Sequence, residues 1–276
     1  MVGFVSSRYL VLGVALSLAA CGGANKDSYV DKPVEELYNG AVDFLVDENY
    51  EKAAKQFEEV DRQHPYSVWA TKAQLMSAYA QYQASNYADS ILALDRFIQL
   101  HPGNRDIAYA YYLKALDYYV QITDVGRDQE NTNQAFKSLE EVSRRFPDSK
   151  YARDARLKLD LARDHLAGKE MEIGRFYQRE GQFLSAINRF KRVLDQYQTT
   201  THVPEALHRL TECYLRLGLV DEAQRTTAVL GYNYAGTDWY KDSYDLVGGQ
   251  GQAPGLATPA QTSKDGWFGR VLDWIF

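Results

Sequence analysis

The sequence is poor in cysteine, methionine and proline. Its 276 residues include only 2 Cys, 3 Met and 7 Pro. Two cysteines cannot form the disulfide framework of a small secreted domain. The five histidines have no cysteine or carboxylate pattern around them that is typical of a zinc site, so we expect no metal. The sequence contains no HExxH, GxSxG or P-loop motif, and we therefore expect neither an enzyme nor a bound cofactor.

An excess of basic charge is also lacking. The formal net charge is -6 at pH 7, so the field of the protein repels phosphate backbones, and no basic stripe with interleaved aromatic residues counteracts it. We therefore expect no nucleic-acid partner. Tyrosine, in contrast, is abundant, with 21 residues. Its side chain joins a flat apolar ring to a polar tip, which suits half-buried surfaces, binding grooves and cores alike.

The first twenty residues have the features of a secretory signal peptide. A single charge, Arg8, precedes an apolar run over residues 9–18 that is too short to span a bilayer, and two small residues follow. We predict that residues 1–20 are removed on export. The string LAAC, residues 18–21, resembles the bacterial lipobox, in which the sulfur of the cysteine is joined to a diacylglycerol. The alternative is an ordinary cleavage site with a chance cysteine at Cys21.

Lipidation of Cys21 would attach the protein to a membrane. A bacterial lipoprotein typically carries three acyl chains, and each buried methylene contributes about 0.8 kcal/mol, so such attachment is effectively permanent. The next residue is Gly22, not the Asp that resembles an inner-membrane retention signal, and this favours the outer membrane. Residues 21–33 then form a polar, flexible tether. Cys213 is left without a partner, and its apolar-periodic surroundings indicate a small buried side chain instead of a reactive thiol.

The rest of the chain has the apolar spacing of successive helices and contains an internal repeat. Three copies share a small residue, an apolar residue four positions later, another three after that, and Pro five beyond: NYEKAAKQFEEVDRQHP (49–65), NYADSILALDRFIQLHP (86–102) and NTNQAFKSLEEVSRRFP (131–147). Two copies without the proline follow at 181–198 and 218–230. This spacing resembles the second helix of a tetratricopeptide repeat. Small residues let paired helices approach, large ones fill the hollow of the next repeat, and Pro ends the second helix.

The repeat predicts an all-α tetratricopeptide-repeat solenoid of about five helix pairs over residues 34–245. Copy three carries about eight extra residues between its helices, in the loop 121–134. Between copies three and four, one long central helix is predicted from Ser149 as N-cap to Gly181 as stop, with Gly168 as its only interruption. The simplest interpretation of the mixed charges of this helix is a solvent-exposed face on which oppositely charged side chains pair at i,i+4 spacing.

The first helices of copies two and three are rich in aromatic residues. Placed on the repeat register, the concave face of the array presents Lys72, Leu75, Tyr79, Tyr82, Tyr109, Tyr112, Leu116 and Tyr119. An extended or helical peptide with aromatic and aliphatic side chains would be the natural ligand of such a groove. The alternative is that these tyrosines form the core between repeats, because Tyr is common in such cores and the register can slip by one residue.

The order of the motifs resembles the outer-membrane assembly lipoprotein family called BamD, ComL or YfiO. The strings that carry the resemblance, over residues 18 to about 245, are EEVDRQHPYSVWA, DRFIQLHPGNRDIAYAYYLKAL, DVGRDQ, RRFPDSKYARDA, HLAGKEMEIGRFY, AINRF and TDWYKDSY. The resemblance implies a periplasm-facing, non-catalytic subunit of the machinery that inserts β-barrel proteins into the outer membrane. Another tetratricopeptide lipoprotein, such as a secretin pilotin, is the alternative.

The same resemblance implies a set of protein partners. The C-terminal repeats would bind the POTRA domains of the barrel subunit, next to other lipoproteins of the assembly complex. The N-terminal repeats would bind the carboxy-terminal targeting strand of unfolded barrel proteins. Within AINRF, Arg189 matches a basic position that the family directs toward the barrel subunit. The alternative is a surface arginine on a solvated helix, which needs no function.

The end of the chain departs from the family. Residues 246–263 read as a linker, and the segment 264–276 carries an apolar helical face made of Trp267, Phe268, Val271, Leu272, Trp274, Ile275 and Phe276. We expect this amphipathic segment to dock on a partner groove or on the membrane interface. The alternative is that Leu272, Trp274 and Phe276, which alternate along the chain, imitate a targeting strand and occupy the groove of the protein itself.

Overall fold

The computed structural model describes residues 31–248, and its regular structure in that range is α-helix throughout. The helices are α2 (Val34–Val46), α3 (Tyr50–Gln63), α4 (Val68–Gln83), α5 (Tyr87–Leu100), α6 (Ile107–Tyr119), α7 (Glu130–Arg145), α8 (Lys150–Arg179), α9 (Phe183–Gln196), α10 (Val203–Arg216), α11 (Val220–Tyr234) and α12 (Asp238–Leu246). The all-α prediction is confirmed for this part of the chain. The signal peptide, Cys21 and the segment 264–276 lie outside the described residues.

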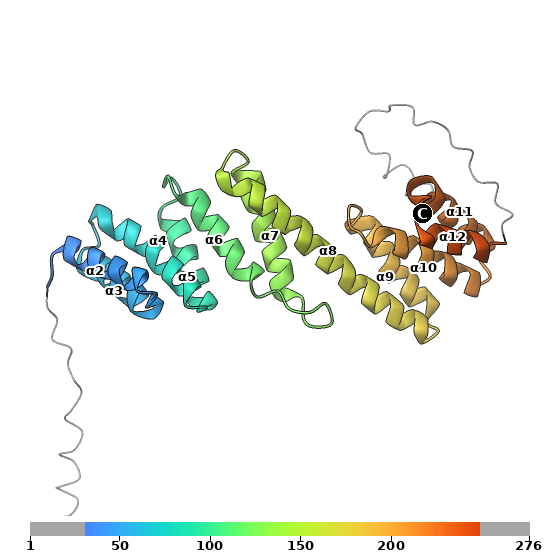
Figure 1. Ribbon diagram of the computed structural model, residues 1–276, viewed down its shortest axis with the longest axis horizontal. Helices are drawn as coiled ribbons and strands as arrows, with labels where there is room; N and C mark the ends of the chain where they lie inside the picture. The colour runs from blue at the N-terminus through green and yellow to red at the C-terminus, as the bar shows by residue number, and fades with distance from the viewer. Residues whose placement is uncertain (1–30, 249–276) are drawn as a thin grey trace, which may run out of the picture.

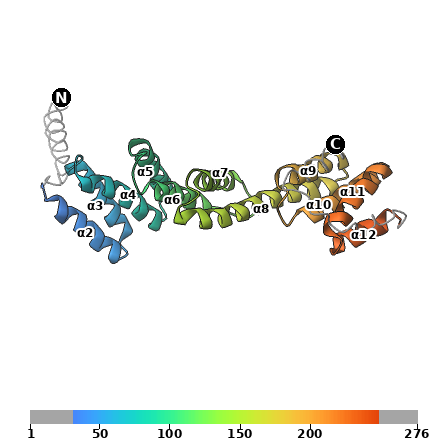
Figure 2. The same cartoon turned by 90° about the horizontal axis from the view of Figure 1, so that it is seen from above.

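The helices form pairs that follow one another along the long axis of the molecule (Figure 1). Consecutive helices pack together from α2 to α11, and the first helices of successive pairs also touch: α2 with α4, α4 with α6, and α6 with α8. Figure 2 shows α5, α7 and α9 along one side of the row and α4, α6 and α8 along the other. We call the latter side the first-helix face. The five pairs are the solenoid that the repeat predicts, and α12, packed on α10 and α11, is an addition to it.

The small and large residues of the repeat pack the pairs against one another. In the first four copies the small positions and the apolar positions four residues later are 0% exposed, at Ala53 and Phe57, Ser90 and Leu94, Ala135 and Leu139, and Ala186 and Phe190. A small side chain lets two helix backbones approach, and the large one fills the space toward the next pair at the density of a protein interior. Four separate cores therefore follow one another along the axis.

The turn inside a pair is the same in repeats one, two, four and five. The residue two positions before the second helix has a positive φ of 56° at Glu48, 62° at Ser85, 73° at Gly181 and 75° at Gly218. The following backbone N–H donates to the carbonyl five residues earlier, as from Asn49 to Phe44 at 2.8 Å. This closure ends a helix with a left-handed residue. Repeat three has its longer loop in place of this turn.

Two substitutions at equivalent turn positions are expected to have opposite effects. Glu48→Gly should stabilise the protein by about 1 kcal/mol, because only glycine adopts the left-handed region without strain. Gly218→Ala should destabilise it by about the same amount. Urea unfolding followed by circular dichroism measures both. Two changes of the same sign would contradict the assignment of strain to these turns.

The central helix α8 is continuous over 30 residues and belongs to two cores. Ala155 and Leu159 lie in the core shared with α6 and α7, whereas Ala167 and Met171 lie in the core shared with α9 and α10. The predicted central helix is confirmed, and it runs through Gly168 without a break. No helix within residues 31–248, α8 included, combines the length and the hydrophobicity that a membrane crossing requires.

The end of the predicted tether is fixed to the first helix pair. The backbone N–H of Lys32 donates to Oε1 of Gln63 at 3.0 Å, and its carbonyl oxygen lies 2.7 Å from Nε2 of His64. The last residues of the tether predicted over residues 21–33 are therefore bound to the solenoid and cannot move freely. The chain is held from Lys32 onward, where it meets the end of α3.

Candidate functional site

The tyrosines predicted to line the groove lie on α4 and α6 and are half-buried. Tyr79, Tyr82 and Tyr109 pack against the core that contains Leu94 and Phe97. Tyr112 and Tyr119 pack against the next core along the axis. Each ring thus covers the core with one part and keeps another part accessible. The sequence left two alternatives open for these tyrosines, groove lining and inter-repeat core. The same side chain can therefore do both.

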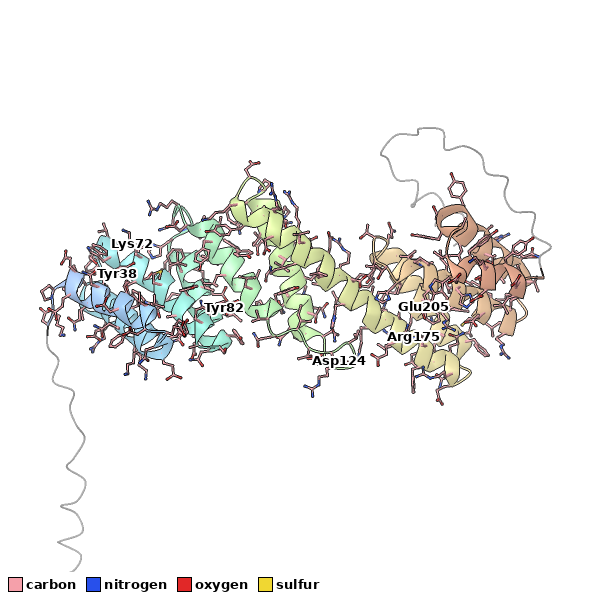
Figure 3. All side chains as sticks on the ribbon, in the orientation of Figure 1. Tyr38, Lys72, Tyr82, Asp124, Arg175 and Glu205 are labelled. Carbon is pink, nitrogen blue, oxygen red and sulfur yellow. The ribbon has the colours of Figure 1, made fainter. Side chains whose placement is uncertain are left out.

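The other predicted groove residues differ in exposure. Leu75 is only 8% exposed and belongs to the core between α4, α5 and α6. Most of its side chain is therefore covered by the core that contains Leu94 and Phe97, and its place in the groove stays a prediction. Leu116 is half-buried, and Lys72 is exposed with its ammonium 5.0 Å from the ring centre of Trp69. Figure 3 shows Lys72 and Tyr82 toward opposite ends of α4.

A tyrosine from α8 completes the aromatic group. The ring of Tyr151 stacks on Tyr112, with centroids 5.1 Å apart and planes 23° apart, and its centroid lies 5.4 Å from that of Tyr109. We call Tyr79, Tyr82, Tyr109, Tyr112, Tyr119 and Tyr151 the tyrosine cluster. Sequence reasoning missed Tyr151 because it treated the charged central helix as a solvated face. The available signal was the spacing of Tyr151, Asp154 and Lys158, which puts all three on one side of a helix.

Asp154 is the ionic centre of the tyrosine cluster. Oη of Tyr112 donates to Oδ2 of Asp154 at 2.5 Å, and Nζ of Lys158 lies 2.8 Å from both carboxylate oxygens. Burial raises the pKa of Asp154, but the hydrogen bonds from Lys158 and Tyr112 outweigh it and bring the pKa below its ordinary value. The Lys158 ammonium also lies 5.6 Å from the ring centre of Tyr119. The cluster therefore holds a fixed ion pair at its edge.

The phenol groups themselves stay uncharged. Burial raises the pKa of Tyr82, Tyr109 and Tyr112 above the ordinary value, and for Tyr112 the hydrogen bond to Asp154 raises the pKa further. Neutral phenols can donate and accept hydrogen bonds, while their rings offer flat apolar area. Such a surface suits the backbone and the apolar side chains of an extended peptide.

A cavity of about 760 Å³ continues from Tyr119 toward the second half of the molecule. Its walls come from the loop of repeat three, from α8 and from the start of α10. Two of its charged side chains have partners within the protein: Arg175 donates to Glu205 at 3.1 Å, and the hydroxyl of Thr201 donates to Asp164 at 2.8 Å. Figure 3 shows Arg175 and Glu205 near one another on α8 and α10.

Arg189 lies on α9 and is paired with α8. Its guanidinium donates to Oε2 of Glu170 at 3.1 Å, and Arg192 donates to Oε1 at 3.0 Å. The side chain of Glu170 is 13% exposed and that of Arg189 is 29% exposed. Arg189 therefore has a partner within the protein, and its role toward the barrel subunit stays a prediction. Two guanidinium groups share one carboxylate, so this corner keeps one positive charge that an acidic group of a partner can neutralise.

Among residues 31–248, no group of three or more His, Cys, Asp or Glu side chains is arranged to hold a metal ion. Cys213 is 0% exposed, which confirms the buried side chain predicted from the sequence. Burial raises its pKa to about 12, so it carries no thiolate near neutral pH. His208, with Nδ1 2.9 Å from Oγ of Ser243, joins α10 to α12.

Known proteins show the same combination of features. The family described as outer membrane lipoprotein, YfiO, matches residues 30–230. The chain is 48% identical to the outer membrane protein assembly factor BamD of Caulobacter vibrioides over 262 residues, which cover 94% of this chain and 86% of that protein. It is also 48% identical to BamD of Rickettsia prowazekii, with 87% and 95% covered.

A more distant curated relative carries the same name. BamD of Neisseria gonorrhoeae is 34% identical over 82% of this chain and 90% of that protein. Among solved structures, the chain is similar to a thermophilic tetratricopeptide-repeat protein of Thermus thermophilus, with 19% identity, a TM-score of 0.37 and coverage of 78% of this chain and 98% of that one. The resemblance seen in the motifs is thus confirmed, and the chain belongs to the BamD family of outer membrane lipoproteins, also called YfiO.

Proposed function

We propose that this protein is a non-catalytic subunit of the β-barrel assembly machinery of the outer membrane, and that its tyrosine cluster binds the targeting strand of unfolded barrel proteins. Its relatives are named as outer membrane protein assembly factors. Lipid attachment at Cys21 would hold the solenoid on the periplasmic face of that membrane. The observation that carries the binding role is the tyrosine cluster on the first-helix face.

The chemistry of a targeting strand matches this surface. Such a strand ends in Phe and has apolar and aromatic residues at alternate positions. Alternate side chains of a strand point to the same side, so these apolar and aromatic side chains lie together on one side of it. The rings of Tyr109, Tyr112 and Tyr151, with centroids 5.1 to 5.4 Å apart, form a continuous platform for them. The neutral phenols can hydrogen bond to the strand backbone. Aromatic anchors of this kind dominate the binding energy of many peptide complexes.

The second proposed contact is with the barrel subunit of the complex, through its POTRA domains. Arg189 and Arg192 share Glu170 and leave one positive charge at the C-terminal half of the solenoid. We propose that an acidic residue of the barrel subunit binds there, and that other lipoproteins of the complex pack nearby. A partly desolvated arginine held in place by a buried carboxylate is a suitable anchor for such a contact. The segment 264–276 remains a predicted docking element outside the described residues.

Photocrosslinking in cells tests the proposed substrate contact. A photoreactive residue at Tyr79 or Tyr112 is expected to capture several different nascent barrel proteins. The matched control is Leu92, which is 71% exposed on α5 at the opposite side of the row. Equal capture from Leu92, or no barrel protein captured at either tyrosine position, would overturn the proposal. Capture of one secretin alone would favour the pilotin alternative.

A further inference from the structure

Asp117 is a carboxyl group buried beneath the tyrosine cluster. It lies on α6 and is 0% exposed. Its Oδ2 lies 2.8 Å from Oγ of Ser90, and its Oδ1 has no hydrogen-bond partner. Among the described residues, no cation forms a salt bridge with it. A carboxylate in this position would be a buried charge with almost no compensation, which is strongly unfavourable.

The hydrogen bonds around Ser90 require one more proton than an ionised Asp117 supplies. The Ser90 hydroxyl lies 2.8 Å from Oδ2 of Asp117 and 3.0 Å from the carbonyl oxygen of Ala78. A hydroxyl has one hydrogen and can donate to only one of these acceptors. If Asp117 is protonated, its O–H donates to Ser90 and Ser90 donates to Ala78, so both short contacts are hydrogen bonds. The geometry therefore fits the protonated acid.

We propose that Asp117 is protonated in the folded protein and is a positioning residue that makes strand binding by the tyrosine cluster depend on pH. The chain of hydrogen bonds from Asp117 through Ser90 to Ala78 joins α6, α5 and α4. Two of these helices, α4 and α6, carry five of the six tyrosines of the cluster. Loss of the proton would leave Ser90 able to donate to only one of its two acceptors, and one of the hydrogen bonds that connect α4, α5 and α6 near the tyrosines would be lost. The coupling to binding rests on the proposed function, whereas the protonation of Asp117 does not.

The surroundings of Asp117 keep it sensitive to pH near neutrality. The titratable groups near Asp117 are Tyr82 on α4 and Tyr109 on α6. Burial raises the pKa of both phenols, so neither is charged near neutral pH. Burial raises the pKa of Asp117 to about 7, and the hydrogen bond from Ser90 lowers it only in part. Asp117 therefore loses its proton as the pH rises through about 7.

The sign of the effect follows from proton binding. An aspartic acid in an unfolded chain has a pKa of about 3.9, so the folded state binds one more proton between about pH 4 and pH 7. The stabilisation is fully present below about pH 4 and is lost as the pH rises through 7. A bound strand would cover Tyr82 and Tyr109 and exclude water, which raises the pKa of Asp117 further. Strand affinity should therefore fall by about three- to tenfold between pH 6 and pH 8.

Carbon-13 NMR of the protein labelled at aspartate carboxyl carbons tests the protonation. One carboxyl resonance is expected to titrate with a midpoint near 7, and the resonance should be absent from the Asp117→Asn variant. A midpoint near 4 for Asp117 would overturn the proposal. The measurement needs no ligand, and the midpoint is read from the wild-type protein, while the variant serves only to assign the resonance.

Binding of a synthetic targeting-strand peptide, measured by fluorescence anisotropy at pH 6 and pH 8, tests the coupling. The amide of Asp117→Asn can donate to Ser90 as a protonated carboxyl does, so this variant should keep at pH 8 the affinity that the wild type has at pH 6. Asp89→Asn, at an exposed position on α5, is the matched control and should lose affinity as the wild type does. Full pH dependence in Asp117→Asn would overturn the coupling. Absence of binding to the wild type at both pH values would overturn the proposed function, while the NMR midpoint still decides the protonation.

Discussion

Replacing Gly174 with alanine is expected to destabilise the C-terminal half of the solenoid by about 3 kcal/mol. A methyl group at this position of α8 would lie 2.4 Å from Cε1 and 2.8 Å from Cδ1 of Phe190. The ring of Phe190 is 0% exposed and is enclosed by the core of α8 to α11. Neither the ring nor the helix can move away without disturbing that core, because interiors are close-packed.

Gly40→Ala is the matched control for this substitution. Gly40 also lies within a helix, α2, but its nearest neighbour is the end of the flexible Gln56 side chain, 3.4 Å from the added methyl group. Alanine should stabilise the helix there by about 0.5 to 1 kcal/mol. Urea unfolding gives both free energies, and hydrogen exchange shows whether the loss in Gly174→Ala is confined to α8 to α11. Equal effects of the two substitutions would contradict the close approach of α8 to α9.

Removing two stacked rings is expected to give the largest loss of binding. The double variant Tyr112→Ala, Tyr151→Ala should lower the affinity for a targeting-strand peptide by about 100-fold, because two central aromatic anchors of the interface disappear together. These rings are stacked at 5.1 Å, and one of them holds Asp154. Isothermal titration calorimetry at constant pH measures the change.

Two controls separate binding from folding in that experiment. Tyr66→Ala removes a tyrosine that is fully exposed in a loop and should leave the affinity unchanged. Tyr112→Phe keeps the stacked ring but loses the hydrogen bond to Asp154, and its affinity should fall less than that of the double variant. If the double variant keeps its melting temperature and binds the peptide as the wild type does, the tyrosine cluster is not the binding site.

The fold could be predicted because each helix pair is specified locally. The small and large residues of one copy, such as Ala53 and Phe57, contact residues of the same helix pair or of the next one. Their spacing along the sequence is therefore enough to predict how the pairs pack. The long helix α8 was predictable for the same reason, since its start and its stop are marked by Ser149 and Gly181. The helix α12 lies outside the repeat, and its packing on α10 depends on pairs such as His208 and Ser243 that no local pattern shows.

The details of the site depend on contacts between distant residues, and these were missed. Tyr112 and Asp154 are 42 residues apart, and Arg189 and Glu170 are 19 apart. Leu75 lies one turn from Tyr79 on the same helix, yet it is covered by α5 and α6 while the tyrosine stays at the surface. Asp117 has tyrosines next to it in the sequence, and only the convergence of α4, α5 and α6 makes it a buried acid. In each case the decisive property is a contact with another helix.

The continuity of α8 sets both a distance and a rotation between the two halves of the protein. With 30 residues it is about 45 Å long, and it begins beside the tyrosine cluster and ends beyond Arg189's partner Glu170. Each residue of an α-helix also turns the chain by about 100°, so the length of α8 fixes the direction in which the two proposed binding surfaces point. If both proposed contacts are made, the strand at one end of α8 and the barrel subunit at the other would therefore keep one separation and one relative orientation.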